Sequence, residues 1–325
     1  MHLITTCYTL AVAVKTKFSH KEFSNILSNY DLGKLVFSKV IREGTVQTNY
    51  ILVTTKEKII FRYYENRQIK SVLFEAELIK FLTKNNYPCP DIFRDKHEKL
   101  VGIYQGKPFA LFEFIEGEHI NNPSETQWKQ LIKYVAQLHA LTRSYIPKYC
   151  QNRWNYTPEL CKKLAKKKAK KIGTKTANEK LEWLKKELLT LHLPNSHPKG
   201  ICHCDFDFSN ILYKGEEFVG LIDFDDANYT YLTFDLVDLL ERGAWRRSDK
   251  HLNLKRARSI ITDYSIYRQL SDIEKEHLFD VYKLSILFDS LWFFERSAAG
   301  DFYEKKKIDF MNKVGRDEFY NMVFG

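Results

Sequence analysis

The chain has few glycines, prolines and cysteines, and it lacks any long apolar run. Its 325 residues include 13 glycines, 8 prolines and 6 cysteines. The cysteines form no C-x-x-C pair and no second cysteine–histidine cluster exists, which favours reduced core thiols over a disulfide framework or a structural zinc site. No apolar stretch reaches the roughly 18–20 residues of a membrane-spanning helix. We therefore expect a cytoplasmic protein without a membrane partner.

The N-terminal residues also lack the features of an export signal. No lysine or arginine precedes their apolar stretch, and Thr5, Thr6 and Thr9 interrupt it. This pattern does not match a secretory signal peptide. We interpret residues 1–14 as an N-terminal extension or a leading strand.

The positive charge of the chain is concentrated in one segment. The formal net charge is +10, and seven lysines lie between Lys162 and Lys171. No aromatic residues alternate with these lysines, which favours a solvated helix face over a nucleic-acid site. The remaining composition, with 44% hydrophobic residues, is typical of a globular protein with a large core.

Two short apolar runs near the middle of the chain each end in an acidic residue. Gly200–Cys204 precedes Asp205, and Phe218–Ile222 precedes Asp223. Such runs indicate buried strands, and the K-G-E-E turn ahead of the second run predicts a hairpin. We expect this hairpin to bring Asp205, Asn210 and Asp223 to one edge.

These three side chains suit a site for magnesium and a nucleotide. Mg²⁺ prefers hard oxygen ligands, which Asn210 and Asp223 offer. The carboxylate of Asp205 is free in this arrangement to accept a hydroxyl proton. The alternative is a pair of buried strands that end in solvated acids, but that reading leaves the order of the three groups unexplained.

The same residues carry a family resemblance. H-C-D-x-x-x-x-N, from His203 to Asn210, and I-D-F, at Ile222–Phe224, resemble the catalytic and metal loops of the protein-kinase superfamily. The pattern is closest to the aminoglycoside-phosphotransferase branch, which carries H-G-D-x-x-x-x-N. The resemblance implies that Asp205 is the catalytic base, that His203 orients its loop, and that Asn210 and Asp223 hold Mg²⁺ beside ATP.

The N-terminal third contains further candidates for binding the nucleotide. Strand-like runs cover Leu35–Ile41, Asn49–Thr54 and Lys58–Tyr64, and Ser71–Thr83 has helical periodicity. On the third run, Arg62 stands where the superfamily keeps its phosphate-binding lysine. A solvent-facing residue on an edge strand is the alternative interpretation.

Two other positions follow from the resemblance. The helix glutamate that pairs with the cation of the third strand matches Glu75 best, with Glu77 as the alternative. The loop over the ATP phosphates would contain Gly44. It lacks G-x-G-x-x-G and Walker-type patterns, so a plain hairpin loop explains it equally well.

The order of the elements predicts an α+β fold, because strands come first and helices follow. The resemblance implies two lobes of the protein-kinase-like type. We expect a small β-sheet lobe with one key helix at 15–113, a hinge at 114–117 and a larger, mainly helical lobe at 118–325. The sequence does not predict an oligomeric state.

Several stretches resemble the kinase-fold homoserine kinases. They are Asn29–Gly33, Glu43–Tyr50, Pro88–Pro90, Leu193–Asp205 and Gly220–Phe224. This likeness implies an ATP-dependent phosphotransferase that acts on the hydroxyl of a small metabolite, with homoserine first. Aminoglycosides and choline or ethanolamine are alternative acceptors. A pseudokinase scaffold is the alternative outside the enzymes, but the intact acids and amide of the motif favour catalysis.

Departures from the family pattern fall near the expected acceptor. Asp225 and Asp226 follow the I-D-F motif in place of an aromatic-rich tract, and Ser209 precedes Asn210 where an aspartate is usual. We interpret Asp207 and Asp226, with Arg242 or Arg246, as groups able to hold a zwitterionic acceptor.

Two more polar residues are assigned supporting roles. His139 lies within a predicted helix and is interpreted as a packed histidine and not as a catalyst. Asp235 resembles the aspartate at a helix start that braces the catalytic loop in the superfamily.

Overall fold

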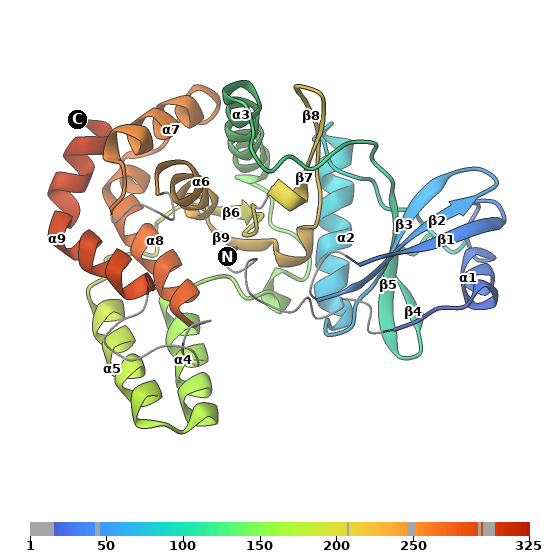
Figure 1. The fold of residues 1–325 in the computed structure, drawn as a ribbon, viewed down its shortest axis with the longest axis horizontal. Coiled ribbons are helices and arrows are strands. Elements are labelled where there is room, and N and C mark those ends of the chain that lie inside the picture. The colour runs from blue at the N-terminus through green and yellow to red at the C-terminus, as the bar shows by residue number, and fades with distance from the viewer. Residues whose placement is uncertain (1–15, 43–45, 207, 246–250, 292–293, 295–302) are drawn as a thin grey trace.

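The computed structural model describes residues 16–42, 46–206, 208–245, 251–291, 294 and 303–325. Figure 1 shows a β-sheet with α1 and α2 at one end of the molecule and the remaining helices at the other. This arrangement confirms the predicted α+β fold with a small sheet lobe and a larger helical lobe. The predicted extension at 1–14 lies outside the described residues.

The N-terminal lobe is built on a five-stranded antiparallel sheet with the order β1-β2-β3-β5-β4. Its strands are β1 Leu35–Ile41, β2 Thr48–Thr54, β3 Lys58–Tyr63, β4 Gly102–Tyr104 and β5 Lys107–Glu113. Helix α1, His20–Leu27, starts at a capping box between Ser19 and Glu22. Helix α2 spans Ile69–Lys84.

The position of β3 explains how this lobe presents Arg62. Alternate residues of a strand point to opposite faces. Phe61 and Tyr63 therefore pack into the aromatic core beside α1, while Arg62 faces the side of α2. The strand lies between β2 and β5 and Arg62 is 11% exposed, so the edge-strand interpretation is wrong.

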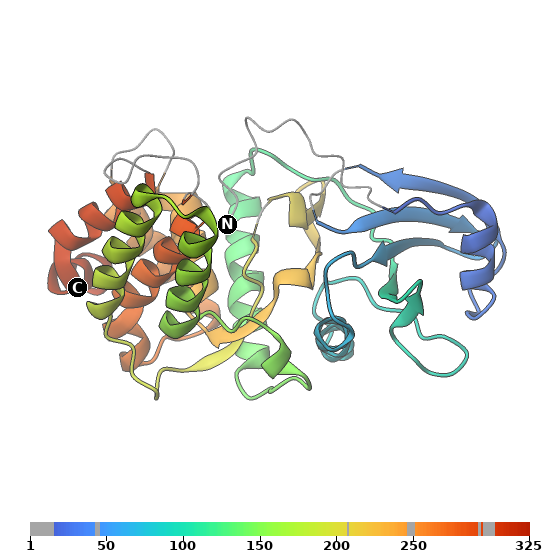
Figure 2. The ribbon, with the colours of Figure 1, turned by 90° about the horizontal axis from the view of Figure 1, so that it is seen from below.

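The C-terminal lobe holds the larger core. Its helices are α3 Glu125–Thr142, α4 Pro158–Ile172, α5 Lys175–Leu189, α6 Phe234–Ala244, α7 Leu254–Tyr267, α8 Asp272–Ser290 and α9 Tyr303–Phe324. Helices α4 and α5 form an antiparallel pair that packs on α8 (Figures 1 and 2). No helix in the described part of the chain is both long and apolar enough to cross a bilayer.

The strands around the catalytic motif pair differently from the sequence expectation in one respect. The predicted turn does form a hairpin, between β7, Ile211–Lys214, and β8, Glu217–Leu221. However, the run before Asp205 forms β6, Lys199–Cys202, and pairs with β9, Asn228–Tyr231. The two short sheets are connected through loops. The 3₁₀ turn η2 (Phe208–Asn210) ends at Asn210, and η3 (Phe224–Asp226) directly follows Asp223.

A buried acid in α9 makes the stability of this lobe depend on pH. Glu304 is 2% exposed, and burial raises its pKa from 4.5 to about 7. Between these values the folded state keeps a proton that the unfolded state releases. The contribution of Glu304 to stability is therefore complete below about pH 4.5 and is lost as the pH rises through about 7.

We accordingly expect Glu304→Gln to raise the free energy of unfolding at about pH 8 and to change it little at about pH 5. Urea titrations of the variant and the wild-type chain at the two pH values measure this difference. An effect of equal size at both pH values would contradict the assignment.

Candidate functional site

Asp205 and Asn210 form the first half of the site. Asp205 follows β6 and is 8% exposed. The side-chain amide of Asn210 donates to the carbonyl oxygen of Asp205 at 2.9 Å and to its Oδ2 at 3.0 Å. Because one amide bonds both the backbone and the carboxylate of Asp205, the loop between the two residues is held closed.

The catalytic loop is fixed from behind by Asp235. This aspartate lies fully buried in the first turn of α6 and accepts from the backbone N–H groups of His203 at 2.7 Å and Cys204 at 2.9 Å. His203 donates from Nε2 to the carbonyl oxygen of Ile222 at 3.0 Å. The loop that carries Asp205 is thereby joined to the strand that leads to Asp223.

His139 supports the same aspartate. Its Nε2 lies 3.0 Å from Asp235 Oδ2, and its Nδ1 lies 2.6 Å from the hydroxyl of Tyr264. Burial lowers the pKa of His139 although Asp235 opposes this effect. The ligand atoms of His139, Cys202 and Asp235 lie within 4.8 Å of one another, but both His139 nitrogens and Asp235 are already engaged within the protein. The cluster is a support of the loop and not a metal centre.

Cys204 adopts a backbone conformation that is costly for its type. Its φ is 62°, in the left-handed region that favours glycine. The H-G-D pattern of related loops has glycine at this point, so the cysteine occupies a position where glycine is relaxed. Burial raises the pKa of its thiol well above the ordinary value, which keeps the sulfur protonated and unreactive.

Asp223 is the second candidate oxygen ligand. The backbone N–H of Ile222 donates to the carbonyl oxygen of Asn210 at 2.9 Å, which places the loops that carry the two candidate ligands side by side. The Asp223 side chain is 37% exposed and its Oδ1 lies 2.7 Å from Nη1 of Arg62. A partly exposed carboxylate next to an amide oxygen fits the hard-oxygen preference of Mg²⁺.

Arg62 lies between two carboxylates. Its Nη1 lies 3.5 Å from Oε1 of Glu75, and its Nε donates to Asn49 at 3.1 Å. Tyr64 donates to the second oxygen of Glu75 at 2.9 Å. The partner of Arg62 on α2 is therefore Glu75 and not Glu77.

The ion pairs of this cluster also set its protonation. Burial raises the pKa of Glu75 to about 7, and Arg62 opposes that rise. Burial also disfavours the charge of Arg62, but Asp223 and Glu75 together raise its pKa above the ordinary value. Arg62 is thus a permanent cation on the N-terminal side of the site, where phosphate oxygens would need it.

Gly44 and Asp207, which are among the candidates from the sequence, lie outside the described residues. The covering loop is nonetheless tied to the site at Gln47, whose amide donates to Asp225 at 2.8 Å. The backbone N–H of Glu65 donates to the side-chain oxygen of Gln47 at 2.8 Å. The end of the loop next to β2 is thus connected to the metal loop.

The sequence did not reveal the contact that Asp225 and Asp226 make with Arg67. Arg67 donates to both oxygens of Asp225, at 2.9 and 3.1 Å, and to Asp226 at 2.7 Å. Arg67 precedes α2, so this contact joins the two lobes beside the metal loop. Asp226, which was expected at the acceptor, contributes to this inter-lobe contact, and its role toward the acceptor stays a prediction.

Arg153 also joins α2 to the segment that follows Asp223. It donates to the carbonyl oxygen of Ala227 at 2.8 Å, to the hydroxyl of Ser71 at 2.7 Å and to the carbonyl oxygen of Asp225. Only the charge pattern of two adjacent acids after the motif could have suggested a cationic partner, and it did not say which one.

We expect Arg67→Gln to lower the free energy of unfolding by about 3 kcal/mol, because Asp225 would stay buried without its cation. Arg67→Lys should cost less, since it retains the charge but not the two parallel hydrogen bonds. Urea titration ranks the three proteins. Equal stability of the glutamine variant and the wild-type chain would show that Arg67 does not hold the metal loop.

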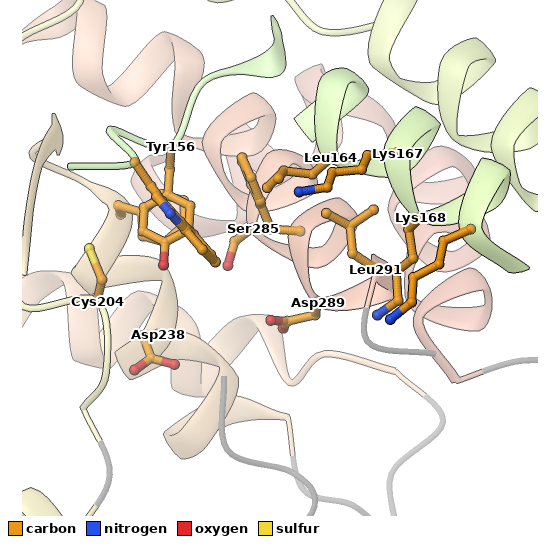
Figure 3. A pocket seen from close by; sticks show the side chains of 13 residues that line it. Tyr156, Leu164, Lys167, Lys168, Cys204, Asp238, Ser285, Asp289 and Leu291 are labelled. Carbon is orange, nitrogen blue, oxygen red and sulfur yellow. The ribbon is translucent and has the colours of Figure 1, made fainter. Parts of the chain in front are cut away.

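A cavity of about 310 Å³ opens beside the catalytic loop. Cys204, next to Asp205, lines one side, and Lys167, Lys168 and Lys171 of α4 line another. Figure 3 shows Cys204 and Asp238 on one side, Lys167 and Lys168 on the other, and Asp289 between them. Lys167 and Lys171 are exposed, as expected for a solvated face, and together with the half-buried Lys168 they also line this cavity.

The acceptor role predicted for Arg242 or Arg246 stays a prediction. Arg242 contacts Asp238 at 3.4 Å on its own helix, and Arg246 lies outside the described residues. Asp238 itself lines the cavity, with Phe234 one turn before it on α6. The cavity therefore takes its charged groups from α4, α6 and α8, which the sequence interpretation did not bring together.

Comparison with known proteins agrees with this geometry. Residues 38–270 match the phosphotransferase enzyme family. A homoserine kinase of Agrobacterium fabrum is 29% identical over 270 residues, which cover 82% of each chain. A homoserine kinase of Nitrobacter winogradskyi is 27% identical over 307 residues, which cover 93% of this chain and 88% of the relative.

Solved structures show the same fold. A spectinomycin phosphotransferase in complex with ADP and spectinomycin has a TM-score of 0.62 at 14% identity and covers 95% of this chain and 99% of its own. A microcompartment-associated aminopropanol kinase has a TM-score of 0.58 at 14% identity, with coverage of 94% and 95%. The resemblance and the kinase-like fold that the sequence predicted are confirmed. The chain belongs to the phosphotransferase enzyme family.

Proposed function

We propose that the protein transfers the γ-phosphoryl group of magnesium-bound ATP to the hydroxyl of a small metabolite, with homoserine as the first candidate. The observation that carries the proposal is the set of contacts that joins Asp205 to Asn210, Asn210 to the residue before Asp223, and Asp223 to Arg62 and Glu75. Each of these groups has the chemistry that phosphoryl transfer requires at its position. The homoserine kinases among the relatives support the choice of acceptor.

The binding roles follow from the geometry. Asn210 and Asp223 would hold Mg²⁺, which neutralises charge on the β- and γ-phosphates when it is bound. Arg62, oriented by Glu75, would contact phosphate oxygens as a bidentate donor. Arg62 contacts Oδ1 of Asp223 at 2.7 Å, so the metal would be coordinated through the other carboxylate oxygen or would replace this contact.

The transfer itself is assigned to the catalytic loop. The acceptor hydroxyl oxygen bonds to the γ-phosphorus while the bond from that phosphorus to the bridging oxygen breaks, and ADP leaves with the electron pair. Asp205 orients the hydroxyl and takes its proton late, because a loose transition state depends on positioning more than on a strong base. His203 acts through its bond to Ile222 by keeping the two loops in register. ATP as the donor places this activity in the cytoplasm.

The testing experiment is ADP release over a panel of acceptors. The panel contains homoserine, threonine, serine, choline, ethanolamine and several aminoglycosides. We expect turnover of homoserine above the rate of ATP hydrolysis without acceptor. Turnover of an aminoglycoside or of choline without turnover of homoserine would overturn the acceptor assignment. Turnover of no compound in the panel would mean that the acceptor lies outside it.

A further inference from the structure

The cavity that Cys204 of the catalytic loop lines has charged groups at its ends and apolar walls. Trp154, Tyr156, Phe234 and Phe288 supply aromatic surface between the catalytic loop and α8. Apolar walls exclude water and strengthen the interaction between charges inside the cavity. A bound molecule would therefore pack against apolar walls and meet charged side chains at the margins.

The lysines of α4 are arranged to act on such a molecule together. Lys167 and Lys171 lie four residues apart, so they share one face of the helix, and both line the cavity. Figure 3 places the lysine side of the cavity opposite Cys204, the residue before Asp205. A molecule with its hydroxyl at Asp205 would thus direct its other end toward α4.

We propose that this cavity binds the phosphoryl acceptor and that Lys167 and Lys171 bind a carboxylate at the end of the acceptor away from Asp205. The inference rests on the proposed function and narrows its substrate class to hydroxylated carboxylic acids, including amino acids. An ammonium group of the acceptor would find Asp289 between the two ends (Figure 3). A polycationic acceptor such as an aminoglycoside would meet like charges at α4 and bind poorly.

The helix offers a matched control. Lys166 and Lys170 lie on the same helix, are exposed, and do not line the cavity. The double variants Lys167→Gln/Lys171→Gln and Lys166→Gln/Lys170→Gln remove equal charge from α4. A general effect of the positive helix on a negative substrate would appear in both, whereas direct contact would appear only in the first.

The measurement is steady-state kinetics of both variants and the wild-type chain with homoserine and with homoserine amide, which lacks the carboxylate. We expect the cavity variant to lose about tenfold or more in kcat/KM for homoserine, the size of a lost charged hydrogen bond, mainly through KM. The control variant should stay near wild type. The cavity variant and the wild-type chain should differ little in kcat/KM for homoserine amide. Neither double variant should change the KM for ATP.

The outcomes separate this inference from the proposed function. Equal losses in both double variants, or an equal loss on the amide, would overturn the carboxylate contact. If homoserine is not phosphorylated but serine, threonine or an aromatic hydroxy acid is, with the same lysine dependence, the homoserine assignment fails and the inference stands. A preference for choline, ethanolamine or an aminoglycoside, or no turnover of any carboxylate, would overturn it.

Discussion

Asp205→Asn is expected to lower kcat by about 10²- to 10⁴-fold, the range for losing a positioned base. Asparagine has the shape of aspartate, and its carbonyl oxygen still accepts the bond that Asn210 donates to Oδ2 at 3.0 Å. The loop should therefore stay folded while the proton acceptor is lost. Affinity for magnesium-bound ATP should change little, because neither phosphate nor metal depends on this side chain.

Turnover is followed by ADP release with the acceptor that the panel identifies, and nucleotide affinity by titration calorimetry. Asp31→Asn is the control, since Asp31 is 91% exposed and pairs only at the surface of the N-terminal lobe with Lys56. A kcat of the Asp205 variant within a few-fold of the control would remove Asp205 from the role of base.

Asp223→Ala is expected to abolish the enhancement of nucleotide binding by Mg²⁺. The ion would lose its main carboxylate, and Asn210 alone offers one neutral oxygen. The fold should tolerate the change, because Arg62 keeps Glu75 as its counter-ion. The protein should thus remain folded but bind ADP equally well with and without magnesium.

Titration calorimetry of ADP binding with and without Mg²⁺ measures this effect. Asp226→Asn is the control, because Asp226 follows the same motif but contacts Arg67. Both oxygens of Asp225 accept hydrogen bonds from Arg67 or Gln47, so Asp225 would have to give up some of these contacts to replace Asp223 as a ligand. Unchanged magnesium enhancement in the Asp223 variant would place the metal away from the I-D-F motif.

The local arrangement of the catalytic motif could be predicted from the sequence. Asp205, Asn210 and Asp223 lie within one short stretch, and their order depends on a turn and on strand ends that local residues determine. The pairing of that stretch was only partly predictable. β7 and β8 meet across a tight turn, but β6 meets β9 across a longer segment that has no turn signal of its own.

The sequence itself determined three features: the order of strands and helices, the catalytic loop, and the cation of the third strand. Each depends on residues that lie close together in the chain. The tertiary structure decided the partners of Asp225 and Asp226, which Arg67 meets across 158 and 159 positions. It also decided that lysines of α4 line a cavity together with Cys204 of the catalytic loop. Both outcomes depend on how separate elements pack against each other. Helical periodicity shows that a helix has an apolar face and a polar face, but it does not show which element each face contacts.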